Sequence, residues 1–110
     1  MSKDLINKKC VPCEGGMSPL SPDEIKEYKS QVDNSWEVED NKKIKRNFSF
    51  DDFKEAMKFI NKVADLAEEE GHHPDIFVSY NKVKITLWTH AISGLSENDF
   101  IVAAKTDNLI

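Results

Sequence analysis

The sequence predicts an α+β fold with the element order α-β-β-α-β-β-α, in which a four-stranded antiparallel sheet has three helices on one face. Two pairs of short segments alternate apolar and polar residues with a period of two, which predicts two hairpins. Three further segments begin with helix-capping residues. Since hairpins pair antiparallel and leave one face of the sheet to be covered, the helices are expected together on that face. At 110 residues the chain has room for one hydrophobic core.

Residues 1–20 are expected to form an irregular N-terminal leader, and residues 21–110 a single domain. The leader has no apolar period and is rich in glycine and proline. Its Cys10 and Cys13 form one CxxC motif, with no second pair to complete a tetrahedral zinc site. Because a redox CxxC usually opens a helix after a strand, and this one contains a proline, we expect two reduced thiols on a mobile arm.

The first helix is expected to begin at Ser21 and to run to about Val32. Ser21 is a typical N-cap, Pro22 suits the first helical position and Glu24 completes a capping box. The expected buried residues are Ile25, Tyr28 and Val32.

The first hairpin follows this helix. Its alternating apolar positions begin with Trp36 and Val38 and resume with Ile44 and Phe48 after a polar turn, residues 40–42.

The second helix has the clearest pattern in the chain. Residues 49–52 supply its N-cap, and Gly71 suits the left-handed position that ends a helix. Its apolar face is expected to consist of Phe53, Ala56, Met57, Ile60, Val63, Ala64 and Ala67.

The second hairpin is expected to turn at Asn81-Lys82, so that the numbers of paired residues sum to 163. This register pairs Ile76 with Leu87, and extending it places His73 opposite His90 on the other face of the sheet. The other expected core positions of the hairpin are Val78, Tyr80, Val83 and Ile85.

The last helix begins at Ser96, which with Asp99 forms a capping box. Its expected buried residues are Phe100, Ala103 and Ala104.

Charge and hydropathy exclude several classes of function. The net charge of −5 argues against a nucleic-acid partner, and the basic run of residues 42–46 is interpreted as a charged edge strand. No apolar run approaches the roughly 18 to 20 residues of a membrane span, and the first residues lack a signal-peptide apolar region. The cytoplasm is therefore the expected location.

All three histidines of the chain fall between positions 72 and 90, which indicates an acid–base site. His72, His73 and His90 could each have a structural role alone, but together and near acidic residues 68–70 they favour a site. A metal site is disfavoured because the adjacent His72 and His73 project to opposite sides of an extended chain. For Glu69 and Glu70 we favour a solvated face, and for Tyr80 and Trp88 sheet packing over ligand stacking.

The same residues resemble the motif of the pterin-4a-carbinolamine dehydratases. The matching stretches are Glu68-Glu-Glu-Gly-His72-His73-Pro74, the aromatic Tyr80, Asn81-Lys-Val-Lys-Ile-Thr-Leu-Trp-Thr-His90 and Gly94-Leu-Ser-Glu-Asn-Asp99. The likeness extends more weakly over about residues 17–105.

The resemblance implies three helices on a four-stranded sheet and a lyase that dehydrates 4a-hydroxytetrahydrobiopterin to quinonoid dihydropterin, with no metal and no organic cofactor. It implies that His72, His73 and His90 are catalytic and that Glu68, Pro74 and Asp99 support the substrate, although the capping box could explain Asp99 alone. We expect His72 and His90 to exchange protons while His73 orients the pterin ring.

The resemblance also implies partners. The family forms dimers of dimers and acts after a pterin-dependent aromatic amino acid hydroxylase. Some of its members are dimerisation partners of a transcription factor, so the alternative function is a non-catalytic interaction module.

Overall fold

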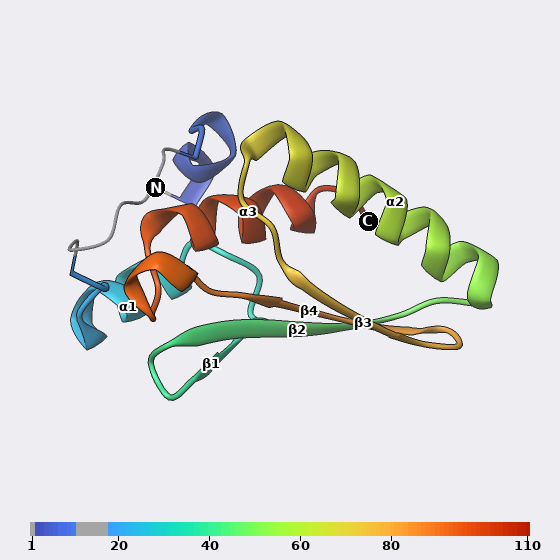
Figure 1. The fold of residues 1–110 in the computed structure, drawn as a ribbon, viewed down its shortest axis with the longest axis horizontal. Helices are drawn as coiled ribbons and strands as arrows, with labels where there is room; N and C mark the ends of the chain where they lie inside the picture. Colours follow the sequence, from blue (N-terminus) through green and yellow to red (C-terminus); the bar gives the residue numbers. More distant parts are fainter. Residues whose placement is uncertain (1, 11–17) are drawn as a thin grey trace.

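A computed structural model describes residues 2–10 and 18–110 and confirms the predicted α+β fold class (Figure 1). The helices and strands occur in the predicted order, with two short 3-10 helices added. In chain order they are η1 (Ser2–Asn7), α1 (Pro22–Lys29), β1 (Glu37–Glu39), β2 (Lys43–Ser49), α2 (Phe53–Glu70), β3 (Asp75–Ser79), β4 (Lys82–Leu87), η2 (His90–Ile92) and α3 (Glu97–Asp107).

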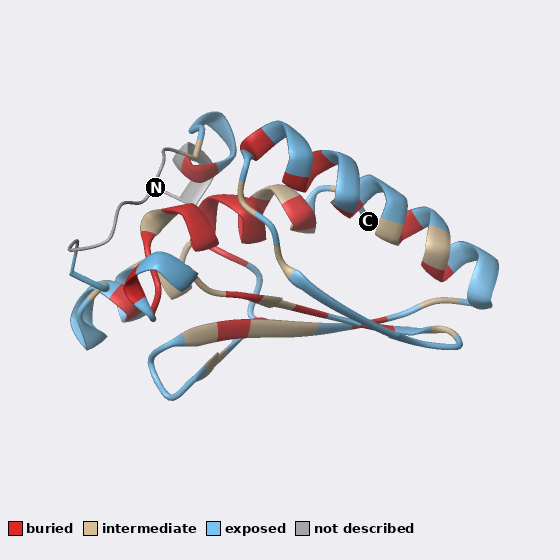
Figure 2. Cartoon of the chain, in the orientation of Figure 1, coloured by how far each residue is buried: buried red, intermediate tan, exposed pale blue. Residues whose placement is uncertain are grey.

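The four strands form one antiparallel sheet in the order β1-β2-β4-β3. Figure 1 shows α2 and α3 side by side over one face of this sheet, and α3 also packs against η1 and α1. As a result α3 is almost completely buried, whereas edge strand β3 is exposed along its whole length (Figure 2). The predicted burial of Phe100, Ala103 and Ala104 is confirmed.

The predicted helix starts are confirmed by their caps. The Ser21 side chain accepts from the Glu24 backbone N–H, and the Glu24 carboxylate accepts from the Ser21 N–H. Helix α1 ends at Lys29, earlier than predicted, although Val32 is still buried. Asp52 caps α2, and Gly71 ends it with a φ of +67°, in the left-handed region that glycine adopts without steric cost.

The apolar face predicted for α2 was partly wrong. Ala56, Val63 and Ala67 are buried, but Phe53 is 49% exposed and Ala64 is also exposed. The helix instead buries an arc that also contains Phe59, Leu66 and Glu70. This arc faces α3 and the sheet, and apolar residues on the neighbouring flank remain outside the contact.

The predicted register of the second hairpin was wrong by two residues. Ile76 pairs with Ile85 and Val78 with Val83, so the turn residues are Tyr80 and Asn81. In this turn Asn81 is fixed to the residue that follows β2: its side-chain amide donates to the Phe50 carbonyl, and its own carbonyl accepts from the Phe50 N–H.

Further predictions for this hairpin were also wrong. Ile76 and Val78, expected in the core, are 39% and 37% exposed on edge strand β3. Tyr80 adopts a φ of +51° in the turn and is 64% exposed instead of lying in the core. His73 and His90 lie outside the paired residues and are not cross-strand partners.

Part of the predicted leader is helical. Residues 2–7 form η1, and Leu5 is only 1% exposed because it packs into the main core. The remainder of the CxxC motif, including Cys13, lies outside the described residues. Among the helices of the described ranges, none combines the length and apolar character that crossing a membrane requires.

Candidate active site

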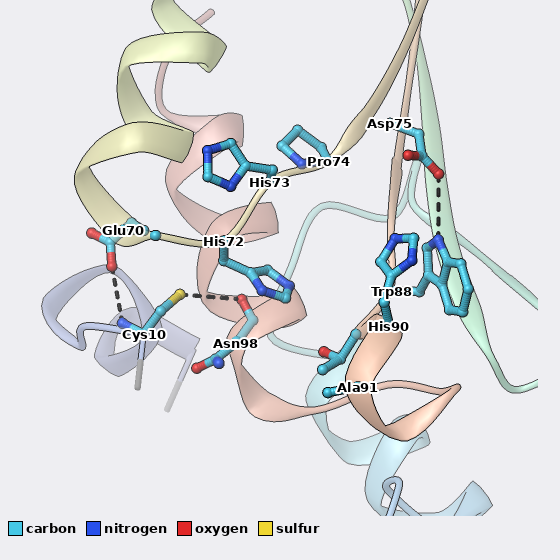
Figure 3. A pocket seen from close by; sticks show the side chains of 12 residues that line it. Cys10, Glu70, His72, His73, Pro74, Asp75, Trp88, His90, Ala91 and Asn98 are labelled. Carbon is cyan, nitrogen blue, oxygen red and sulfur yellow. Dashed lines mark hydrogen bonds between the residues drawn. The ribbon is translucent and has the colours of Figure 1, made fainter. Parts of the chain in front are cut away.

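A pocket of about 600 Å³ lies where the end of α2, the following turn, η2, the start of α3 and the N-terminal segment meet (Figure 3). All three histidines line it, as does Pro74. The complete lining is Cys10, Glu70, Gly71, His72, His73, Pro74, Asp75, Trp88, Thr89, His90, Ala91 and Asn98.

His72 is held by a buried carboxylate. Its Nε2 lies 2.6 Å from Oδ1 of Asp99, whose side chain is 0% exposed. An ionised carboxylate only accepts hydrogen bonds, so Asp99 as a carboxylate places the imidazole hydrogen on Nε2 of His72. The Nδ1 atom makes no hydrogen bond within the described residues and is the ring nitrogen left for a ligand.

Asp99 is itself fixed by two donors at its other oxygen. Oδ2 accepts from the Thr89 hydroxyl at 2.8 Å and from the Ser96 N–H at 3.0 Å. The second bond belongs to the capping box at the start of α3. The capping-box interpretation of Asp99 is therefore confirmed, and its other oxygen contacts the imidazole of His72 and orients that ring.

His73 has a different environment from His72. Its Nε2 lies 2.6 Å from Oε2 of Glu68, but the two side chains are 60% and 78% exposed. Water competes for such a pair, so Glu68 restrains the His73 ring far less than Asp99 restrains His72.

His90 packs against Trp88 at the opposite side of the pocket. Their ring centroids are 3.9 Å apart, and the indole N–H of Trp88 donates to Asp75 Oδ2 at 3.3 Å. The Lys43 ammonium lies 4.7 Å from the indole centroid. Trp88 therefore supports His90 and also lines the pocket, while its contacts with Lys43 and Asp75 tie it to the neighbouring strands.

Glu70 corrects the prediction of a solvated face. Its side chain is 2% exposed, and its Oε2 lies 2.5 Å from the Lys105 ammonium. Burial alone would raise the pKa of Glu70, but the hydrogen bonds from Lys105 and from the Cys10 N–H outweigh it and lower the pKa below its usual value. Glu69, in contrast, is exposed as expected.

Cys10 was also missed as a pocket residue. Its N–H donates to Glu70 Oε1 at 2.9 Å, and its thiol donates to the Asn98 carbonyl at 3.7 Å. Burial and the nearby Glu70 carboxylate raise the pKa of the Cys10 thiol to about 12. This environment favours the neutral thiol over the thiolate that would act as a nucleophile.

The structure brings together most of the residues that the sequence predicted for the site. His72, His73, Pro74 and His90 line the pocket directly. Asp99 and Glu68 are not part of its lining but contact His72 and His73. Among the described residues, no group of three His, Cys, Asp or Glu side chains is arranged to hold a metal ion.

Comparison with known proteins agrees with the motif. Residues 18–109 match the family model of pterin 4 alpha carbinolamine dehydratase. A provisionally named pterin-4-alpha-carbinolamine dehydratase from Alkaliphilus metalliredigens is 54% identical over 104 residues, covering 94% of each chain. One from Nitrosomonas eutropha, named in the same way, is 48% identical over 97% of this chain and 94% of its own.

Comparison with solved structures also finds pterin dehydratases. The crystal structure of a transcriptional coactivator/pterin dehydratase from Brucella melitensis superimposes with a TM-score of 0.78 and 35% identity, over 84% of this chain and 98% of that one. A pterin dehydratase-like protein described as a RuBisCO assembly factor in the alpha-carboxysome has a TM-score of 0.59 and 28% identity, over 68% and 88%. The chain therefore belongs to the pterin 4 alpha carbinolamine dehydratase family.

Proposed function

We propose that the protein is a hydro-lyase that dehydrates 4a-hydroxytetrahydrobiopterin to quinonoid dihydropterin by histidine acid–base catalysis. The observation that supports this most directly is the pairing of His72 with the buried Asp99 in a pocket that His90 also lines. Membership of the family supports the substrate class.

The reaction needs two proton transfers on one bicyclic ring. The C4a–O bond breaks as the leaving hydroxyl gains a proton, N5 loses its proton, and a C4a=N5 double bond forms while water departs. A general acid and a general base must therefore reach neighbouring atoms of the same ligand. Imidazoles can serve as either near neutral pH, and each such group contributes about 10²- to 10⁴-fold in rate.

We assign the two proton transfers to His72 and His90. Asp99 holds the hydrogen of His72 on Nε2 and leaves Nδ1 to exchange a proton with the ligand. His90 lies across the pocket, supported by Trp88 (Figure 3). His73, with its exposed Glu68 partner, is proposed to orient the pterin ring, and Pro74 to shape the wall beside it.

The volume of the pocket is typical of a small-molecule site. Small-molecule pockets typically measure about 300 to 1,000 Å³, and the volume of about 600 Å³ falls inside that range.

The proposed reaction uses no metal and no organic cofactor.

The direct experiment is a stopped-flow assay of 4a-hydroxytetrahydropterin dehydration by wild type, His72→Ala and His90→Ala at matched folded fraction. We expect wild type to accelerate the spontaneous reaction and both variants to lose about 10²-fold or more of that acceleration. A folded wild type that gives no acceleration would exclude the dehydratase function, and a fully active His90→Ala variant would exclude the role of His90.

We further propose that the protein is a cytoplasmic homo-oligomer that acts after an aromatic amino acid hydroxylase. The oligomer is supported by edge strand β3, where Ile76, Phe77 and Val78 are 39%, 61% and 37% exposed. An exposed apolar edge strand invites pairing with another chain. Light scattering of the purified chain would show a monomer if this proposal is wrong.

The second candidate function is a non-catalytic interaction module. It is favoured by two of the similar solved structures, one a transcriptional coactivator/pterin dehydratase and the other a pterin dehydratase-like protein identified as a RuBisCO assembly factor. The same exposed strand could bind a protein partner by strand addition. Failure of the dehydration assay with folded wild type would make this candidate the leading one.

A further inference from the structure

The N-terminal segment Ser2–Cys10 contributes one wall residue to the pocket, Cys10. Leu5 is inserted into the core against α3, and Cys10 lines the pocket. In Figure 3 the ring of His72 lies between Cys10 and Asn98 on one side and Trp88 and His90 on the other. The segment therefore faces the catalytic pair proposed above from the side opposite Trp88.

This wall belongs to the chain beyond the family model. The family match begins at residue 18, whereas the segment ends at Cys10. Membership of the family therefore does not by itself imply that residues 2–10 take part in the site.

A single carboxylate joins the segment to the catalytic turn. Glu70 is the last residue of α2, directly before Gly71 and His72. Its Oε1 accepts from the Cys10 N–H at 2.9 Å, and its Oε2 accepts from Lys105 of α3 at 2.5 Å. One side chain thus links three parts of the pocket: the N-terminal segment, the end of α2 and α3.

Because Glu70 is buried, its carboxylate depends on both of its hydrogen-bond partners, Lys105 and the Cys10 N–H. A carboxylate with a side chain only 2% exposed needs a compensating charge, which Lys105 supplies. Its second oxygen is then directed at the Cys10 backbone. Because Glu70 Oε1 accepts a hydrogen bond from the segment while Oε2 pairs with Lys105, placement of the segment and formation of the buried ion pair favour each other.

We propose that Glu70 is a positioning residue for the pterin substrate: it holds the segment Ser2–Cys10 against the pocket, so that Cys10 forms the wall across from Trp88. The identity of the substrate rests on the proposed function. The thiol acts as a neutral contact surface and weak donor, and no bond to sulfur forms. Loss of the wall loosens substrate binding and leaves the histidines in place.

The first test separates binding from chemistry with the matched variants Glu70→Gln and Glu69→Gln. Glutamine at position 70 keeps the shape but has one acceptor oxygen, so it cannot serve both Cys10 and Lys105. Glu69 is the adjacent, exposed residue with the same charge. For Glu70→Gln we expect a KM raised about fivefold or more with kcat within about twofold of wild type, and for Glu69→Gln both constants within about twofold.

The second test reports on the wall directly, through alkylation of Cys10 by iodoacetamide. Cys13 is the only other cysteine, so all proteins are compared in a Cys13→Ser background. Release of the wall exposes the thiol and removes the causes of its raised pKa, so Glu70→Gln should be alkylated about tenfold faster than Glu69→Gln. Saturating 7,8-dihydrobiopterin should slow alkylation of the parent protein.

Leu5→Ala supplies an independent variant should Glu70→Gln fail to fold. It loosens the same segment at its other anchor and leaves Glu70 and Lys105 unchanged, so it should reproduce the higher KM and the faster alkylation.

The two tests distinguish failure of this proposal from failure of the proposed function. If wild type is inactive but Glu70→Gln is alkylated faster, the dehydratase function is excluded, while the finding that Glu70 holds the segment Ser2–Cys10 against the pocket stands. Active wild type with unchanged alkylation, or with faster alkylation and an unchanged KM, would overturn the positioning role of Glu70.

Discussion

Nε2 of His72 lies 2.6 Å from Oδ1 of Asp99, and this contact joins the turn after α2 to the first turn of α3. The carboxylate has no exposed surface and receives two more hydrogen bonds at its other oxygen. The orientation of His72 is therefore set by the same group that caps α3, which links the proposed chemistry to the formation of a helix.

Replacing Asp99 with Asn should reduce kcat about 10²-fold or more. An amide at this position must turn its NH₂ group either toward His72, which reverses the tautomer, or toward the donors Thr89 and Ser96. The second arrangement leaves buried donors unsatisfied at a cost of about 1–3 kcal/mol. Stopped-flow kinetics corrected for the folded fraction would measure the first effect and urea unfolding the second. Wild-type kcat in the folded variant would contradict the role of the carboxylate.

His73→Ala should affect turnover less than His72→Ala or His90→Ala. His73 and its partner Glu68 are largely exposed, so their pairing is screened by water and salt. We expect about a tenfold loss in kcat/KM for His73→Ala and a loss within about threefold for Glu68→Gln, compared with about 10²-fold or more at the other two histidines. An equal loss at all three histidines would show that His73 takes part in proton transfer.

Asp107→Ala should lower stability without changing the kinetics of the folded protein. Asp107 Oδ1 lies 2.6 Å from the guanidinium of Arg46 and accepts from the indole N–H of Trp36 at 2.8 Å. Both donors would lose their acceptor in a part-buried setting, at a cost of about 1–3 kcal/mol each. Urea unfolding measures the loss. Because Asp107 lies at the opposite end of α3 from Asp99, a changed kcat per folded molecule would contradict this separation.

Alkaline pH should destabilise wild type more than Cys10→Ser. The folded-state pKa of Cys10, about 12, is above the ordinary value of 9.0, so folding favours the neutral thiol. This contribution is complete below pH 9 and is lost as the pH rises from 9 toward 12, because the unfolded chain ionises first. Urea unfolding at about pH 8 and about pH 10.5 should show a steeper decline for wild type. Parallel declines would mean that the thiol is not buried beside Glu70.

The type and order of the elements could be predicted because caps and periodicity are local. Ser21, Asp52 and Ser96 begin helices through contacts within three residues, and Gly71 ends one by its own backbone conformation. The strands of the second hairpin were found from their period of two, but their register was not. Since the error was two residues, every side chain kept its face of the sheet while each changed its partner.

Some residues of the candidate site could be predicted from local sequence and others could not. His72, His73 and His90 could be selected because histidine is rare in this chain and clusters in its sequence. The environments of Cys10 and Glu70 could not, since their partners are distant in the chain: 60 residues separate Cys10 from Glu70, and 35 separate Glu70 from Lys105. A run of three glutamates has no local feature that distinguishes the buried one.

From the sequence alone we predicted the fold class, the helix boundaries to within a few residues, the family motif and the three histidines. Each depends on residue type and spacing along a short stretch of chain. The folded structure was needed to show which arc of α2 is buried, where the second hairpin turns, that Asp99 both caps a helix and holds His72, and that Leu5 and Cys10 reach the core and the pocket. These features arise from packing between distant segments, where burial makes one particular partner necessary and the local pattern does not indicate which.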